Sequence, residues 1–447
     1  MRVEAVGNDT TLAAPTRLLL RRMLCPLTGL SQEIGFVLRG PGEPRIAIAG
    51  GEMTGVHVLR GSPPPARGAY HIGGSGMTYD EAVIRTLGET VERYAQFTAF
   101  AAGRQRAVGA SLGEMLTSGR EVLASPSLRL FSDDQLDRPG FPFARIDDGT
   151  EIGWLRGCSP ADGSECWMPA QQAVVGYPGL PGEPRFAEGV TTGTAAHTSF
   201  GRTLRNALLE LVQIDAAMGH WYGRARSVTL GSDARTRAVE GAIARRLVRH
   251  GAAPRFHWLP SADLPGFAIA CVIEGPRPPT VAVGLGCDLR LGRAIYNAFL
   301  EGVAVAQLAK VSLFRRAMDR RLETSGDGGS GHIYDLDSNV VRYAASEPGA
   351  LGPRFDGEPV PPSDLPPDVD LGVAGDVAHL LDAFADTGKR LGSLELTTED
   401  VRALGFRVVR VWSPDMLTLS LPDAPPALHP RFDAYGGFAR EDPHPYP

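Results

Sequence analysis

Apolar residues recur in two patterns along this chain, and each pattern predicts a different kind of element. Short apolar runs, alternating or continuous and bounded by glycine or proline, are typical of strands. Such runs predict strands at residues 45–50 (RIAIAG), 266–275 (GFAIACVIEG), 280–286 (TVAVGLG) and 406–413 (FRVVRVWS). Strands and longer helical stretches in one chain predict an α+β fold that forms one compact unit.

Three longer stretches have the spacing of helices, at residues 82–93, 203–215 and 294–307. In the second stretch Leu204, Leu208 and Leu211 recur at helical spacing. The first stretch follows Thr78 and Glu81, which have the spacing of a capping box, so the helix is expected to begin there.

Each of these predicted helices carries a glutamate seven residues after its opening small residue: Glu89, Glu210 and Glu301. Glu92 shares a helical face with Glu89. For a single helix, pairing of Glu89 with Arg85 and solvation of Glu92 would be an ordinary explanation. Three helices with the same placement favour a shared cation, because carboxylates in apolar surroundings are costly to bury unpaired.

Carboxylates that converge from separate helices can ligate Mg²⁺, which in turn binds nucleotide phosphates. The chain has no G-x-x-x-x-G-K-[ST] phosphate loop and no G-x-G-x-x-G after a strand. If it binds ATP, we expect a carboxylate-bound metal to hold the nucleotide between the helices.

Glycine and proline gather in loops at 61–68, 176–184, 325–332 and 357–370. The last two loops bracket a predicted flexible loop at 322–370. We expect residues 1–60 to form an N-terminal segment that contributes to the core, and residues 61–447 to form the main domain.

Composition and charge narrow the class of partner. The net charge of −6 gives no basic excess for nucleic acid or an anionic membrane, so neither is expected as a partner. No apolar run approaches the roughly 20 residues of a spanning helix, and the first residues lack a signal pattern, so the cytoplasm is expected. The five cysteines contain no C-x-x-C pair, which argues against a zinc site and a disulfide framework.

Four motifs, in order, resemble those of the YcaO family, specifically its azoline-forming cyclodehydratases. The first is the glycine-rich turn followed by G-E-x-x-E-R, within residues 73–95. The second lies in residues 192–223, with E-x-x-Q at 210–213, and the third lies in residues 288–307. The fourth is P-x-P-x-P at 443–447, the tail common among these cyclodehydratases. The resemblance runs from about residue 25 to the last residue.

The resemblance implies a magnesium and ATP site with defined residues. Glu89, Glu92 and Glu210 are implied to hold Mg²⁺, and the remaining positions are implied to bind ATP or its phosphates: Ser75, Arg85, Arg93, Thr192, Gln213 and Glu301. The stiff tail is implied to bring the α-carboxylate of Pro447 to the active site, where it orders the site or accepts a proton.

Some positions depart from the family pattern. Ser75 stands where a lysine is common, Arg85 where a serine is common, and Thr192 and Ile214 where asparagine and arginine are common. Either Arg85 replaces the missing cation, or the chain is a catalytically impaired relative.

The implied reaction is ATP-dependent cyclodehydration of a ribosomal precursor peptide, in which Cys, Ser or Thr becomes a thiazoline or oxazoline. The implied partner is a leader-peptide-binding protein related to ubiquitin-activating enzymes, and a homodimer is a possible assembly. Two alternatives stay open: a YcaO enzyme that forms a thioamide or an amidine, and a non-catalytic scaffold that binds peptide or partner.

Overall fold

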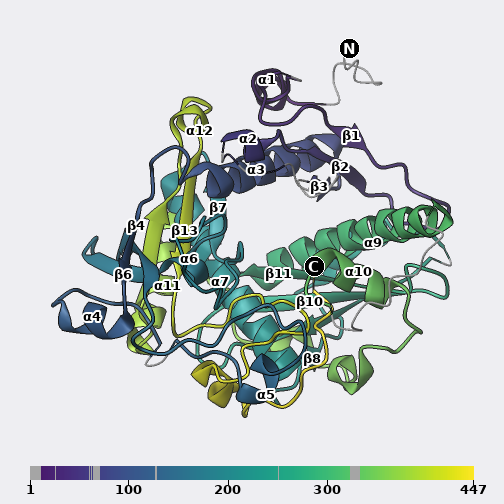
Figure 1. The fold of residues 1–447 in the computed structure, drawn as a ribbon. Coiled ribbons are helices and arrows are strands. Elements are labelled where there is room, and N and C mark those ends of the chain that lie inside the picture. The colour runs from purple at the N-terminus through teal and green to yellow at the C-terminus, as the bar shows by residue number, and fades with distance from the viewer. Residues whose placement is uncertain are drawn as a thin grey trace.

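The computed structural model describes residues 12–25, 27–59, 61, 63, 71–125, 128–249, 251–322 and 333–446. Within these residues the strands form three sheets, and all strand pairs inside the sheets are antiparallel. Figure 1 shows the smallest sheet beside α3 at the top, with the two larger sheets below it.

The small sheet has the order β1-β2-β3, with β1 at Gly35–Phe36, β2 at Ala47–Glu52 and β3 at His71–Gly76. The four-stranded sheet has the order β11-β10-β9-β8 and comprises β8 (Val228–Thr229), β9 (Pro254–Trp258), β10 (Phe267–Glu274) and β11 (Val281–Asp288). The six-stranded sheet has the order β4-β5-β12-β13-β7, and β6 pairs with β5. Its strands are β4 (Ala107–Ala110), β5 (Ile152–Cys158), β6 (Glu165–Pro169), β7 (Thr194–His197), β12 (Gly392–Glu395) and β13 (Arg407–Trp412).

The longest helices are α3 (Tyr79–Thr98), α7 (Phe200–Tyr222) and α9 (Leu291–Leu322). The shorter helices are α1 (Ala14–Met23), α2 (Val56–Leu59), α4 (Leu112–Thr117), α5 (Asp133–Leu136), α6 (Ala170–Ala173), α8 (Arg237–Ala244), α10 (Leu336–Ala344), α11 (Gly372–Asp386) and α12 (Glu399–Ala403). Three 3₁₀ segments are described: η1 (Gly352–Phe355), η2 (Pro362–Asp364) and η3 (Pro430–Tyr435).

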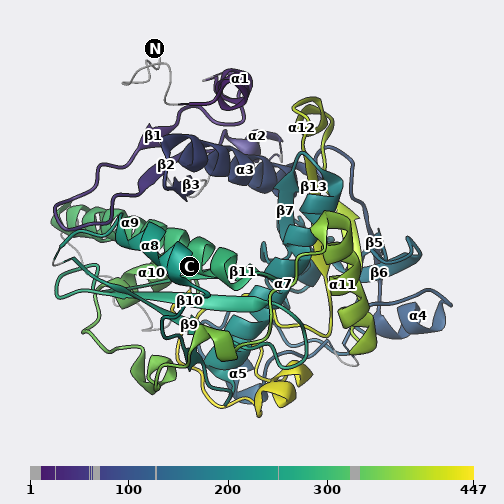
Figure 2. The same ribbon diagram turned by 180° about the vertical axis from the view of Figure 1, so that it is seen from behind.

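Helix α7 runs through the middle of the molecule, and Figures 1 and 2 show it between the two larger sheets. It packs against β10 and β11 on one side and against β7 and β13 on the other. Leu208, Leu211 and Tyr222 are completely buried. A helix that is apolar almost all round is expected to be buried in this way.

Helix α9 packs closely on β11 because two strand residues have no side chain. A Cβ atom on Gly284 would lie 2.0 Å from the backbone nitrogen of Gly302, and one on Gly286 would lie 2.4 Å from that of Ala298. Both glycines therefore permit a helix-to-sheet approach that also sets the position of Glu301.

Helix α3 begins as expected, with Thr78 as its N-cap accepting a hydrogen bond of 3.2 Å from the backbone N–H of Glu81. Its apolar face, including Leu87 and Val91, is buried against the small sheet. Met23 and Ala49 from the N-terminal segment belong to the same hydrophobic cluster.

The predicted mixed fold is confirmed, and the four predicted strands correspond to β2, β10, β11 and β13. Within the predicted flexible loop 322–370, the described part contains α10, η1 and η2, and it buries Tyr343 and Phe355. Flexibility of that loop stays a prediction.

Among the helices of the described residues, none is long and apolar enough to cross a membrane.

Candidate nucleotide and metal site

The three long helices bring four glutamates into one group. Glu89 and Glu92 lie on α3, Glu210 on α7 and Glu301 on α9. Glu92 is repelled by Glu210 and Glu89, while Glu301 is repelled by Glu89 and itself repels Glu210. We call these four residues the carboxylate cluster.

Burial makes the negative charge of the carboxylate cluster costly. Burial, followed by repulsion from Glu210 and Glu89, raises the pKa of Glu92 well above its usual range. Burial also raises the pKa of Glu210 to about 8 and that of Glu301 to about 7, although nearby donors and arginines oppose the change. These surroundings therefore favour the protonated form of the three carboxyl groups, and a bound cation would favour their ionised form.

Glu89 is held by two neighbours. The expected glycine-rich turn is strand β3, where the backbone N–H of Gly73 donates to Oε2 of Glu89 at 2.8 Å. Nη2 of Arg93 lies 2.8 Å from Oε1 of Glu89. Arg85 instead contacts Glu81 at 3.2 Å and the Asn297 side-chain oxygen at 3.0 Å. Glu89 therefore pairs with Arg93 and not with Arg85, which pairs with Glu81.

The other predicted site residues differ in their burial and in their hydrogen-bond partners. Ser75 is buried, and its hydroxyl donates to the carbonyl of Leu300 at 2.9 Å, one residue before Glu301. The hydroxyl of Thr192 accepts from the backbone N–H of Leu419 at 3.2 Å. Gln213 is half-buried one turn after Glu210. Pro447 lies outside the described residues.

Gly193 connects the Thr192 turn to the carboxylate cluster. A backbone hydrogen bond from Gly193 lowers the pKa of Glu210, against the larger effect of burial. Gly193 has a φ of +79°, and a Cβ atom there would lie 2.4 Å from the Val411 carbonyl oxygen. Only glycine fits this position without strain.

Arg410 on β13 is a site residue that the sequence reasoning missed. Its side chain is 1% exposed, its Nε donates to the Ala173 carbonyl at 2.9 Å, and its Nη2 has no hydrogen-bond partner. Burial lowers its pKa to about 10, while the nearby Glu210 and Glu92 oppose that change. The available signal was Arg410 between apolar residues in the middle of the strand, because a buried arginine is costly unless it meets negative charge.

The donor set fits a divalent metal ion, because carboxylate oxygens are the ligands that Mg²⁺ prefers and a cation would offset the cost of ionising these buried groups. Within the ranges that the structure describes, no three His, Cys, Asp or Glu side chains are already arranged to hold a metal ion. Both oxygens of Glu89 are occupied by Gly73 and Arg93. A metal would therefore compete with Arg93 for Glu89.

A family model matches most of the chain. The model, described as YcaO cyclodehydratase, ATP- and Mg²⁺-binding, matches residues 73–417. A search of curated proteins gives no significant match.

Solved structures with the same fold share little sequence with this chain. A heterocyclase solved in complex with substrate and cofactor has a TM-score of 0.70 and 20% identity, over 99% of this chain and 58% of the heterocyclase. This chain thus spans little more than half the length of that relative. The YcaO protein of Methanopyrus kandleri, bound with AMPPCP and Mg²⁺, has a TM-score of 0.57 and 18% identity over 90% of each chain.

A third solved structure is a multi-protein assembly. A chain of the E. coli microcin synthetase McbBCD complex, with pro-MccB17 bound, has a TM-score of 0.60 and 11% identity, over 95% of this chain and 99% of that one. At these identities the solved structures support the fold alone. The family match confirms the predicted family and its cofactors, ATP and Mg²⁺. The chain belongs to the YcaO family.

Proposed function

We propose that this chain is an ATP-dependent cyclodehydratase that converts Cys, Ser or Thr of a ribosomal precursor peptide into azolines. The observation that carries the proposal is the carboxylate cluster, whose members come from three helices and are costly to ionise where they are buried without a cation. A YcaO domain over residues 73–417 supports the same reaction class.

We propose the following roles for the site residues, on the basis of the family motifs that they match. Glu89, Glu92 and Glu210 hold Mg²⁺. The residues that bind ATP and its phosphates are Ser75, Arg85, Arg93, Thr192, Gln213 and Glu301. The positive charge of Arg410 offsets the repulsion between Glu92 and Glu210. When bound, Mg²⁺-ATP supplies a phosphoryl group that makes the amide oxygen a good leaving group.

The proposed reaction forms one bond and removes one water equivalent. The substrate thiol or hydroxyl would lose its proton as its sulfur or oxygen bonds to the preceding carbonyl carbon, and the amide nitrogen would lose its proton to leave a C=N bond. The amide oxygen would depart as phosphate, with the phosphoryl group supplied by ATP. The α-carboxylate of Pro447 is our candidate for ordering the site or accepting that proton. The chain positions these groups and excludes water from them.

We propose that a second protein presents the peptide. The heterocyclase relative is considerably longer than this chain, and the McbBCD relative is a complex with its peptide bound. A leader-peptide-binding protein related to ubiquitin-activating enzymes would raise the effective concentration of a core peptide that binds through few contacts.

Substitutions that remove a carboxylate charge but keep the side-chain volume test the assignment of the metal ligands. Glu89→Gln and Glu210→Gln are expected to abolish Mg²⁺-ATP turnover and to keep the fold, whereas Glu358→Gln, at an exposed position, is expected to behave as wild type. Turnover would be measured with partner and peptide supplied, and folding by thermal melting. Wild-type turnover in either folded variant would refute the assignment, and no turnover by wild type under any condition would favour the scaffold.

A further inference from the structure

Strand β1 is the outer strand of the small sheet, and one of its edges is uncovered. The strand order β1-β2-β3 leaves one side of β1 without a neighbouring strand among the described residues. Figures 1 and 2 show β1 at the margin of the molecule, away from the two larger sheets. The side chains of Phe36, Val37 and Leu38 are 44%, 37% and 88% exposed. An uncovered apolar edge strand is a template for pairing with another chain.

The register of β1 shows which backbone groups lie at the free edge. The backbone N–H of Val37 donates to the Ile48 carbonyl at 2.9 Å, so Val37 directs its backbone groups toward β2. Successive residues of a strand direct their N–H and C=O groups to opposite sides. The N–H and C=O groups of Phe36 and Leu38 therefore face away from β2, where a second strand can bind them.

The segment 33–39 (EIGFVLR) has opposite charges at its two ends. Glu33 and Arg39 are both exposed, and neither forms an ion pair with another described residue. If two copies of this segment pair antiparallel about Phe36, residues equally far before and after Phe36 face each other. Glu33 of each copy then lies opposite Arg39 of the other copy. Opposite charges directly across two strands stabilise the pair, whereas like charges destabilise it.

The charges also select one register for this pairing. Centring the pair on Gly35 would place Glu33 opposite Val37 of the second copy, and centring it on Val37 would place Glu33 opposite Pro41. Neither alternative pairs a charge. Pairing about Phe36 uses the free backbone groups and both charged residues, so the segment is complementary to itself in this register.

The face of β1 that carries Phe36 adds aromatic contact to the interface. The Phe36 ring lies edge-on to the ring of Tyr79 at the start of α3, with ring centres 5.0 Å apart. Tyr79 is itself 51% exposed. Two antiparallel strands related by a two-fold axis through Phe36 carry these rings on the same face of the joined sheet. Pairing would therefore bury aromatic surface of both copies.

We propose that the free edge of β1 is an interface between two copies of this chain, which pair antiparallel about Phe36 and join their small sheets into one. The joined sheet contains β3 of each copy, where the Gly73 N–H donates to Glu89. Dimerisation thus extends the sheet that supports the carboxylate cluster. The paired segment is short, so we expect a dimer that dissociates on dilution.

Reversal of the two charges tests the interface. Sedimentation velocity of the full chain over a range of concentrations should show wild type approaching twice the chain mass of 47.6 kDa. Glu33→Arg or Arg39→Glu places like charges opposite each other at both ends, so each should raise the dissociation constant about ten-fold. The two substitutions in one chain should restore the wild-type value. Glu358→Arg, at another exposed position, is the matched control.

A cysteine at the two-fold axis tests the register. Directly opposite residues of a hydrogen-bonded antiparallel pair have Cα atoms about 5.5 Å apart, which is within the range that a disulfide spans. Phe36→Cys should therefore form a disulfide-linked dimer under mild oxidation, seen on a non-reducing gel. Phe200→Cys, at a position that is 54% exposed at the start of α7, should give no more linked dimer than wild type.

Three results would overturn the proposal. A wild-type mass of one chain at every concentration would assign the free edge to a strand of a different protein. A double charge variant that stays as weakly associated as the single variants would exclude the pairing of Glu33 with Arg39, and a dimeric Phe36→Cys chain without the disulfide would exclude the register. If thermal melting shows that Phe36→Cys is unfolded, the charge variants decide. Association is measured without peptide or ATP, so these outcomes do not depend on the proposed function.

Discussion

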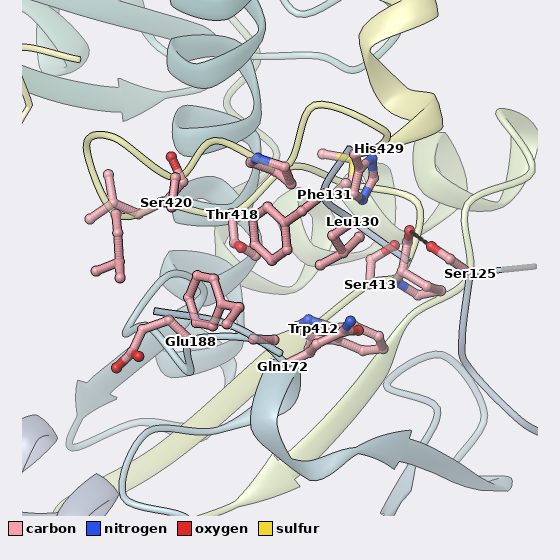
Figure 3. Close-up of a pocket in the computed structure, with 18 residues that line it drawn as sticks. Ser125, Leu130, Phe131, Gln172, Glu188, Trp412, Ser413, Thr418, Ser420 and His429 are labelled. Atoms are coloured by element: carbon pink, nitrogen blue, oxygen red, sulfur yellow. Dashed lines mark hydrogen bonds between the residues drawn. The ribbon is translucent and has the colours of Figure 1, made fainter. Parts of the chain in front are cut away.

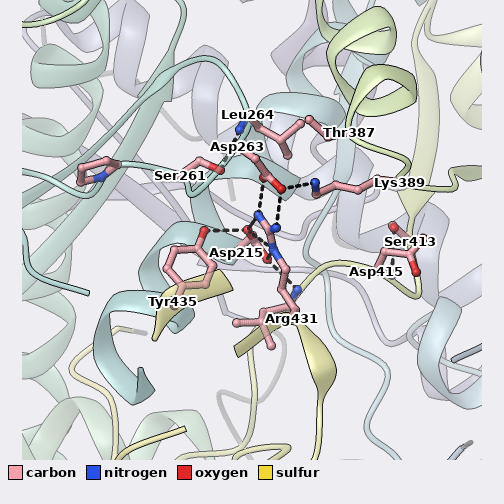
Figure 4. A network of polar contacts seen from close by, with 12 residues as sticks. Asp215, Ser261, Asp263, Leu264, Thr387, Lys389, Ser413, Asp415, Arg431 and Tyr435 are labelled. Carbon is pink, nitrogen blue, oxygen red and sulfur yellow. Dashed lines mark hydrogen bonds and ion pairs between the residues drawn. The ribbon is translucent and has the colours of Figure 1, made fainter. Parts of the chain in front are cut away.

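Arg431 and Asp215 form a buried ion pair, with Nη2 of the guanidinium 2.7 Å from Oδ2 of the carboxylate (Figure 4). Asp215 is completely buried on α7, and Arg431 is 7% exposed in η3. Tyr435 also donates to Asp215 at 2.7 Å. This single carboxylate therefore joins the C-terminal segment to the central helix.

The first prediction concerns this pair. Asp215→Asn is expected to lower the free energy of unfolding by about 3–5 kcal/mol, because it leaves a buried guanidinium with less compensating charge. Asp433→Asn, an exposed position in η3, serves as the control and should change it little. Urea unfolding measures both, and an effect of Asp215→Asn below about 1 kcal/mol would contradict the role of the pair.

The second prediction concerns Arg410 and Glu210. Because Arg410 is buried among carboxylates, Arg410→Gln should destabilise the metal-free chain, and adding Glu210→Gln should restore part of the loss. We expect a coupling free energy of about 1–3 kcal/mol from the double-mutant cycle, measured by urea unfolding in EDTA. Additive effects would show that the two groups do not interact.

Much of the fold could be predicted from the sequence, because helices and strands here are marked by local periodicity. The three predicted helices each carry a glutamate at the same position, and this indicated that Glu89, Glu210 and Glu301 would lie close together. Arg410 was missed because its strand was assessed only for apolar pattern, and its partners lie on α3 and α7. The Asp215 and Arg431 pair is separated by more than 200 residues, so no local pattern contains it.

A small pocket lined by Phe131, Trp412 and His429 (Figure 3) was also beyond sequence reasoning. Its lining joins residues near 130 and 143, 172 and 187, and 412–429, whose proximity depends on tertiary packing. For the C-terminal tail, by contrast, a local sequence pattern was informative. Its prolines predicted stiffness, and the structure buries the segment through Tyr446, whereas Pro447 lies outside the described residues.

The third prediction concerns acid. His444 is completely buried between Tyr222 and Tyr446, and its Nε2 lies 2.9 Å from the Ser420 carbonyl oxygen. Burial lowers its pKa to about 4 from the ordinary value of 6.5. The unfolded chain then binds a proton that the folded chain does not, so the free energy of unfolding falls as pH drops from about 6.5 to about 4, by up to about 3 kcal/mol.

Urea unfolding of wild type and His444→Gln across this pH range tests that expectation. The variant should have a lower stability at pH 7.5 and a shallower decline toward pH 4. His257 and His429 have similarly lowered pKa values, so part of the decline should persist. Parallel curves for the two chains would show that His444 does not contribute to acid sensitivity.

The fourth prediction concerns docking of the tail. The Asn339 side-chain nitrogen on α10 donates to the carbonyls of His444 and Tyr446, and Trp221 donates to that of Asp442 at 2.7 Å. Asn339→Leu removes the donor of both tail hydrogen bonds at similar volume, so we expect ring formation to fall by about ten-fold or more, while ATP affinity changes little.

The matched control for the tail is Asn206→Leu, the same substitution at an exposed position of α7. Ring formation would be followed by mass spectrometry, and ATP affinity by calorimetry. Normal ring formation in folded Asn339→Leu would show that tail docking by this residue is dispensable.

The most direct measurement is the mass of a leader-containing precursor peptide after incubation with the chain, its partner and Mg²⁺-ATP. The account predicts loss of one water mass per ring, matched by one ADP per ring, for wild type and no loss for Glu210→Gln. A gain of mass from exchange of oxygen for sulfur would indicate a thioamide. An unchanged peptide with every component supplied would contradict catalysis by this chain.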